Sequence, residues 1–213
     1  MYNYILFDLD GTLTDPAEGI TNSAAYSLSK YGIEVSDKKE LYKFIGPPLK
    51  DSYIEYYGFS ESDALQAIEY YREYFKPKGM FENKVYSGVP ELLNTLKQSG
   101  KRVILATSKP EVFSTEILKH FDLYKYFDFV SGATLDGTRS KKADIIAYAL
   151  AEMRIIEKEK CLMVGDRAQD INGAIANGID SLGVLYGYGD RAELENAGAT
   201  YIAETVEDII KYV

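Results

Sequence analysis

The sequence has very few of the residues that build disulfides, zinc sites and histidine-based catalytic sites. Its 213 residues include one cysteine, Cys161, one histidine, His120, and no tryptophan. A single cysteine excludes an intramolecular disulfide and a cysteine-rich zinc site, and it fits a reducing, cytoplasmic environment. His120 comes near the end of an expected helix, where a histidine interacts with the helix dipole, and Cys161 opens an expected buried strand. Neither residue therefore indicates a nucleophilic site.

A basic leader and long hydrophobic runs are also lacking. No apolar run approaches the roughly 20 residues that a membrane-spanning helix needs. An acidic residue follows Met1 within a few positions, so we expect no signal peptide and no membrane partner. The formal net charge is −9, and an acidic surface does not attract nucleic acid. An anionic substrate would need a local positive site, which a bound metal ion supplies.

The order of apolar segments predicts an α/β protein. Residues 4–7 form a short apolar run that is typical of a buried strand. After residue 85, expected helices alternate with further apolar runs. These expected strands are 102–106, 127–130, 161–164 and 181–185. Such alternation predicts parallel βαβ units and a doubly wound, Rossmann-like sheet with helices on both faces.

A block without strands interrupts this alternation. Asp15 is expected to cap a helix that has Pro16 at its first position. Further helical segments are expected at 38–44, 49–57 and 60–75, because Pro47-Pro48 and Gly58 separate them. We therefore predict a core domain of residues 1–14 and 85–213, with a helical domain of residues 15–84 inserted after the first strand.

Polar side chains follow several of the expected strands at their carboxyl ends, where open parallel sheets bind ligands. Asp8-Leu-Asp10-Gly11-Thr12 follows the first strand, Thr107-Ser108-Lys109 the second, and Gly165-Asp166 a later one. Lys141-Lys142 opens a helix between them. Clustered carboxylates repel one another unless a cation is present, and hard oxygen ligands without histidine or cysteine suit Mg²⁺.

The chain resembles the haloacid dehalogenase superfamily in four motifs that follow one another in the same order. They are Asp8-x-Asp10-Gly11-Thr12, the apolar strand that ends in Thr107, the later lysine, and Gly165-Asp166-x-x-x-Asp170. The resemblance covers the whole chain. The helical insert is similar to the small cap of the phosphoglycolate phosphatase-like branch.

The resemblance implies a role for each motif residue. Asp8 would be the nucleophile that forms an aspartyl phosphate, and Asp10 the general acid and base. Thr107 would bind a phosphoryl oxygen and Lys142 would neutralise charge on the phosphate and Asp8. Lys141 is the alternative lysine, but Lys142-x-Asp144-x-Ile146 is closer to this branch. Phosphoryl-binding candidates are also Gly11, Thr12 and Ser108. The implied Mg²⁺ ligands are Asp8, Asp166 and the Asp10 carbonyl, and Asp170 would bind the ion directly, through water, or by holding another ligand.

Two features of the insert bear on the substrate. The turn Gly46-Pro-Pro-Leu-Lys50 lies in a part of the cap that faces the catalytic pocket in similar proteins, so Gly46 and Lys50 are candidate substrate-binding residues. The alternative for Lys50 is a surface lysine that follows a helix-breaking turn. The many tyrosines of the insert are interpreted as half-buried packing residues, and a base-stacking cleft is the less favoured interpretation.

The expected function is a Mg²⁺-dependent hydrolase of small phosphomonoesters, resembling phosphoglycolate phosphatase or 5′-nucleotidase. A sugar phosphomutase is the main alternative, and an inorganic pyrophosphatase or a non-catalytic binding protein is less favoured. Asp10 argues against a carbon–halogen substrate, because the dehalogenases of the superfamily lack the second aspartate. The expected partner is a small phosphorylated metabolite, and the expected assembly is a monomer or weak homodimer.

Overall fold

The computed structural model describes residues 1–213 and shows two compact units. The first unit comprises Met1–Asp15 and Val85–Val213, and the second comprises Pro16–Lys84. The chain passes between them through two short strands, β2 (Thr14–Asp15) and β3 (Lys84–Val85), which pair with each other. Each unit therefore has its own packing, and two chain segments connect them.

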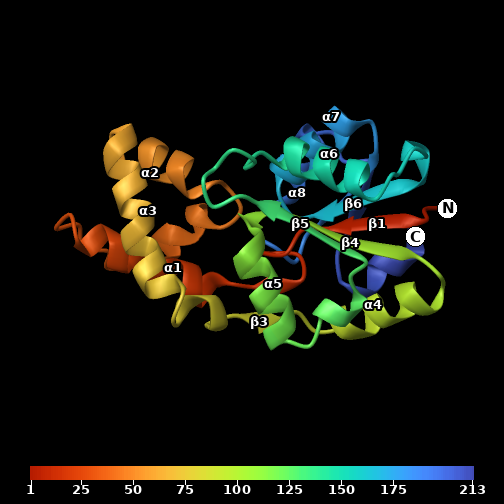
Figure 1. Ribbon diagram of the computed structural model, residues 1–213, viewed down its shortest axis with the longest axis horizontal. Helices are drawn as coiled ribbons and strands as arrows, with labels where there is room; N and C mark the ends of the chain where they lie inside the picture. The colour runs from red at the N-terminus through yellow and green to blue at the C-terminus, as the bar shows by residue number, and fades with distance from the viewer. The chain divides into compact units, whose positions relative to one another are not determined.

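The first unit is built on a six-stranded sheet in the order β5-β4-β1-β6-β7-β8, and all of its pairings are parallel (Figure 1). The strands are β1 (Tyr4–Phe7), β4 (Arg102–Pro110), β5 (Phe129–Ala133), β6 (Cys161–Gly165), β7 (Asp180–Val184) and β8 (Tyr201–Ala203). In chain order, β4 and β5 follow β1 on one side, and β6, β7 and β8 then lie on the other side. The carboxyl ends of β1, β4 and β6 therefore adjoin at a topological switch point, where such sheets bind ligands.

Helices cover both faces of this sheet (Figure 1), and the predicted doubly wound α/β class is confirmed. The helices α4 (Val89–Gln98) and α5 (Glu111–His120) lie on one face, and α6 (Lys142–Glu152) and α7 (Ala168–Asn177) on the other. The remaining elements of the unit are short: η3 (Tyr124–Tyr126), η4 (Lys158–Lys160), α8 (Arg191–Asn196) and η5 (Glu207–Lys211).

The two middle strands, β1 and β6, are apolar because both of their faces are covered. Ile5, Leu6 and Phe7 of β1 have no exposed surface. Leu6 packs with Met163 of β6 and Ile145 of α6 in one hydrophobic cluster. Polar side chains begin directly after these buried runs, so the core fixes the positions of the strand ends.

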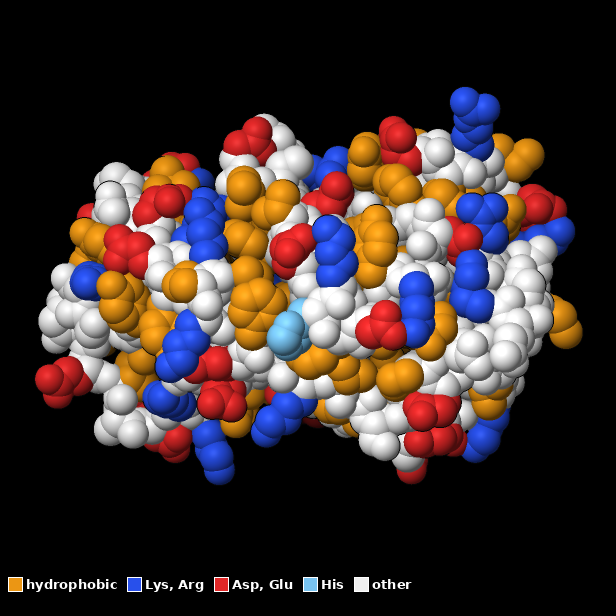
Figure 2. Space-filling view, turned by 60° about the horizontal axis from the view of Figure 1, so that its bottom comes forward, with side chains coloured by type: hydrophobic (Ala, Val, Ile, Leu, Met, Phe, Trp, Pro, Cys, Tyr) orange, Lys and Arg blue, Asp and Glu red, His pale blue; other side chains and the backbone are white.

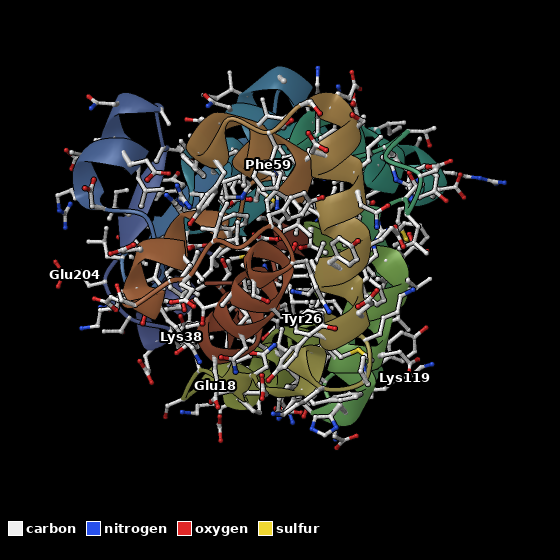
Figure 3. The ribbon with its side chains drawn as sticks, turned by 90° about the vertical axis from the view of Figure 1, so that its left-hand side faces the viewer. Glu18, Tyr26, Lys38, Phe59, Lys119 and Glu204 are labelled. Carbon is white, nitrogen blue, oxygen red and sulfur yellow. The ribbon has the colours of Figure 1, made fainter.

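The second unit is helical. It contains α1 (Ala17–Ser29), η1 (Lys38–Phe44), α2 (Leu49–Tyr57), α3 (Glu61–Phe75) and η2 (Gly79–Phe81). Its aromatic rings pack on one another: Phe59, labelled in Figure 3, has its ring centroid 4.6 Å from that of Tyr31 and 5.7 Å from that of Tyr53. Tyr53 is fully buried. Such ring contacts support packing as the role of these tyrosines.

The surface carries mixed charge. Figure 2 shows acidic and basic side chains interspersed over the face that it presents, with small hydrophobic areas between them. No helix has both the length and the apolar character that crossing a membrane requires.

Candidate active site

Three buried carboxylates meet at the carboxyl ends of β1 and β6. Asp8 directly follows β1, and its backbone N–H donates to the carbonyl of Val164 at 2.9 Å, which aligns the two strand ends. Asp166 follows β6, and Asp170 lies in the first turn of α7. One carboxylate oxygen from each of the three lies within 4.8 Å of the others. The register of the sheet therefore brings together residues that are far apart in the chain.

Local backbone contacts hold Asp170 against this site. Its carboxylate accepts a hydrogen bond from the backbone N–H of Arg167 at 3.1 Å, which caps the start of α7. Gly165 makes the approach possible, because a Cβ at this position would lie 2.2 Å from the Asp170 Cγ. The sequence Gly165-Asp166-x-x-x-Asp170 thus combines a strand end, a close approach and a helix cap.

Lys142 is the cation that the structure places within this cluster. Its Nζ lies 2.8 Å from Asp8 Oδ1 and 2.7 Å from Asp170 Oδ1, and it donates to the carbonyl of Ala106 at 3.1 Å. Burial alone lowers the pKa of Lys142, but the charges of Asp170 and Asp8 outweigh it and leave the pKa above its usual value. Lys141, the alternative in the sequence, is exposed, so the buried ammonium belongs to Lys142.

The protonation of the other two carboxyls responds to burial and to like charge. Burial, with the charges of Asp170 and Asp8, raises the pKa of Asp166 well above its usual value. Burial raises the pKa of Asp170 to about 6, although the Lys142 ammonium opposes the shift. A divalent cation would stabilise the ionised forms, and the donors are all hard oxygen atoms. The residues therefore fit a Mg²⁺ ion held by Asp8, Asp166 and Asp170.

A tight turn follows Asp10 and packs on Asp166. Gly11 adopts a φ of 84°, and a Cβ there would lie 2.1 Å from Asp166 Oδ2, so only glycine fits. The Thr12 hydroxyl donates to Asp166 Oδ1 at 3.2 Å. The hydroxyl of Thr12, predicted as a phosphoryl-binding residue, thus lies against a predicted metal ligand.

An irregular end of β4 shapes the other side of the site. Thr107 pairs with Gly132, but the next pairing is Pro110 with Ala133, so the register shifts between them. Such a bulge changes the direction of side chains. Thr107 is buried, Ser108 is half-buried, and Lys109 is buried and forms an ion pair with Asp10. The sequence predicted that Lys109 follows this strand, but it did not predict the ion pair with Asp10.

The loop after β7 was also not anticipated. The backbone N–H of Tyr188 donates to Asp166 Oδ2 at 2.8 Å, and the Tyr186 hydroxyl donates to the Thr12 carbonyl at 2.9 Å. A Cβ on Gly187 would lie 2.3 Å from the Asp166 Cβ. The run Tyr186-Gly-Tyr-Gly directly after a predicted strand was the available signal for this loop.

The two candidate residues of the insert lie in the second compact unit. Gly46 has a φ of 103°, which fits the turn. Lys50 forms an exposed ion pair with Glu61. Their part in substrate binding stays a prediction.

His120 and Cys161 lie at the helix end and the strand start that their sequence positions predict. His120 is the last residue of α5, with its ring centroid 4.8 Å from that of Phe121. Burial raises the pKa of the Cys161 thiol to about 11, so little thiolate forms at neutral pH.

Comparison with known proteins matches this arrangement to a family. The model of the haloacid dehalogenase-like hydrolases matches residues 5–184. The chain belongs to this family. A 5′-nucleotidase of Pseudomonas aeruginosa is 47% identical over 193 residues, which cover 91% of this chain and 87% of the relative. The tyrosine-protein kinase PtkA of Mycobacterium tuberculosis is 37% identical, with 96% of this chain and 70% of the relative covered.

Other relatives of this haloacid dehalogenase-like hydrolase agree with the predicted branch. A phosphoglycolate phosphatase of Colwellia psychrerythraea is 26% identical, with 97% of this chain and 94% of the relative covered. A crystal structure described as a predicted phosphatase from Clostridium acetobutylicum superimposes with a TM-score of 0.97 at 55% identity, covering 99% of this chain and 97% of that one. The resemblance stated from the motifs is therefore confirmed.

Proposed function

We propose that this hydrolase is a Mg²⁺-dependent phosphatase of small phosphomonoesters that acts through an aspartyl phosphate on Asp8. The observation that carries the proposal is the environment of the Asp8 carboxylate. It is buried, it contacts the Lys142 ammonium, and it lies within 4.8 Å of carboxylate oxygens of Asp166 and Asp170. This arrangement suits a nucleophile whose negative charge must be balanced while it approaches a phosphate.

The residues have complementary tasks in the first step. An Asp8 oxygen attacks phosphorus, and the bond from phosphorus to the ester oxygen breaks. Asp10, two residues further along the chain, gives a proton to the departing oxygen. The Thr107 hydroxyl binds a phosphoryl oxygen, and Lys142 balances the charge on Asp8 and the phosphoryl group. A bound Mg²⁺ ion would supply charge neutralisation at the phosphoryl oxygens.

Water completes the reaction in the second step. Asp10 takes a proton from the water that attacks phosphorus, the bond between Asp8 and phosphorus breaks, and inorganic phosphate leaves. Burial raises the pKa of Asp10 above its usual value, with Lys109 opposing the shift. A raised pKa favours the protonated form that the first step requires.

The names of the relatives support the substrate class. They include 5′-nucleotidase and phosphoglycolate phosphatase, and both names denote the loss of phosphate from a small ester. The insert of residues 16–84 would serve as a cap that shields the aspartyl phosphate from random water. A sugar phosphomutase would form the same intermediate, so release of free phosphate, rather than sugar-phosphate isomerisation, separates the two.

The test is an Asp8→Asn variant assayed for phosphate release from an aryl phosphate and a panel of phosphorylated metabolites in Mg²⁺ buffer. We expect activity to disappear while the melting temperature stays in the range of a folded protein. Asp122→Asn is the matched control, because Asp122 is exposed and has a left-handed backbone that asparagine tolerates. An Asp8→Asn variant with wild-type activity would end the proposal.

A further inference from the structure

The strongest feature that the proposed mechanism does not use is a buried ion pair between Lys109 and Asp10. The Nζ of Lys109 donates to Asp10 Oδ2, and the two side chains are only 6% and 10% exposed. Burying a lysine ammonium is costly unless it is paired. A lysine at the end of β4 would normally extend into water, so its inward direction needs a reason.

The backbone of β4 provides the direction. The register shift lies between Thr107 and Pro110, so Lys109 belongs to the irregular segment. The backbone N–H of Lys109 also donates to Thr107 Oγ1 at 3.3 Å. Lys109 therefore contacts two residues with proposed roles in the reaction: Asp10 through its ammonium group, and Thr107 through its backbone.

These contacts distinguish the two oxygens of Asp10. The ammonium group occupies Oδ2, whereas Oδ1 is buried and has no hydrogen-bond partner. An oxygen that accepts a hydrogen bond from an ammonium group is a poor place for the carboxyl proton, so the proton belongs on Oδ1. The Thr107 hydroxyl already accepts from the backbone, so its own hydrogen is available to donate.

We propose that Lys109 is a positioning residue that makes Oδ1 of Asp10 the oxygen that delivers the proton to the leaving group. The inference rests on the proposed function. It goes beyond that function because it gives Lys109 a role that only some substrates require. An alkoxide leaving group needs a proton in the first step, whereas a nitrophenolate leaves without one.

The test compares kcat/KM of wild type, Lys109→Met and Lys109→Arg for an alkyl phosphate and for p-nitrophenyl phosphate. The ratio kcat/KM reports the steps up to departure of the leaving group. Because general acid catalysis contributes about 10²–10⁴-fold, we expect Lys109→Met to lose at least about 100-fold with the alkyl ester and less than about 10-fold with the aryl ester. Lys109→Arg keeps a cation at this position and should recover part of the loss.

A double variant separates the proposed role of Lys109 from the effect of leaving the Asp10 carboxylate without its positive partner. Asp10→Asn should show the same preference for the aryl ester, and adding Lys109→Met to it should cause little further change, because the group that Lys109 orients is already absent. In the Asp10→Asn background, Lys109→Met leaves no unpaired buried carboxylate, so the double variant should not unfold for that reason.

Three outcomes would overturn the proposal. One is an equal loss of kcat/KM for both esters in Lys109→Met, which indicates a structural role. Another is a rise in KM with unchanged kcat, which indicates that Lys109 binds substrate directly. The third is an additive loss in the double variant. Failure of the proposed function looks different, because wild type would then release phosphate from neither ester.

Discussion

The carboxylate cluster should make the stability of the metal-free protein fall as the pH rises through the acid range. Burial raises the pKa of Asp170 from 3.8 to about 6. A carboxyl with a raised folded pKa binds its proton more tightly in the folded state. Its contribution is therefore greatest below pH 3.8 and is lost progressively up to about pH 6. Two pKa units correspond to about 3 kcal/mol of unfolding free energy.

Other groups of the cluster do not reverse this direction. The pKa of Asp166 is also raised, so its contribution falls with rising pH too, over a window that begins at 3.8 and extends upward. The pKa of Lys142 is raised above 10.5, so its stabilising contribution is fully present throughout the acid range. For a chain of this length, about 3 kcal/mol corresponds to a melting-temperature change of about 6–12 °C.

Magnesium should remove the loss, because the ligands bind the ion only when they are deprotonated. The assay is thermal unfolding followed by circular dichroism at pH 4, 5, 6 and 7, in EDTA and in excess Mg²⁺. Surface carboxylates titrate in both buffers, so the difference between the two melting temperatures isolates the cluster. We expect a difference near zero at pH 4 that grows to pH 7. A difference of equal size at both ends of this range would refute the reasoning.

Two further changes test the parts around Asp166. Asp166→Asn removes one like charge from the cluster, so the metal-free variant should be at least as stable as wild type at pH 7. Mg²⁺ should no longer raise the melting temperature of this variant. A large loss of metal-free stability would contradict this expectation. Gly187→Ala places a Cβ 2.5 Å from the Gly11 carbonyl oxygen and should cost about 1–3 kcal/mol in thermal unfolding. Its control, Gly137→Ala, has a φ of 76° with open space and should cost about 1–2 kcal/mol. Only Gly187→Ala should reduce the rise in melting temperature that Mg²⁺ causes. An equal rise in the Gly187→Ala and Gly137→Ala variants would contradict a role of the loop after β7 in holding Asp166.

Several helix boundaries were predicted correctly because the residues that mark them, such as proline and glycine, lie next to them in the sequence. The expected helical segments at 38–44 and 49–57 coincide with η1 and α2, since the proline pair and Gly58 mark their ends. The strand expected at 127–130 instead runs from Phe129 to Ala133. Asp128 explains the shift, because its carboxylate accepts from the Val103 backbone N–H and pairs with Lys97.

Other features were placed differently or missed. Asp15 was expected to cap a helix with Pro16 at its first position, whereas α1 begins at Ala17 and has Pro16 at its N-cap. The Asp15 carboxylate accepts a hydrogen bond from the Tyr188 hydroxyl, a distant contact that the sequence did not predict. The strand β8 and the helix α8 were missed, because short segments of three and six residues carry little periodicity.

The sequence by itself determined the α/β class and the residues that follow each buried strand, because apolar periodicity and motif spacing are properties of neighbouring residues. Only the tertiary structure decided which of these residues touch. The parallel register of β1 and β6 brings Asp8 to Asp166, and the irregular end of β4 turns Lys109 toward Asp10. Such contacts join residues about a hundred or more positions apart, so they depend on strand register and packing rather than on local pattern.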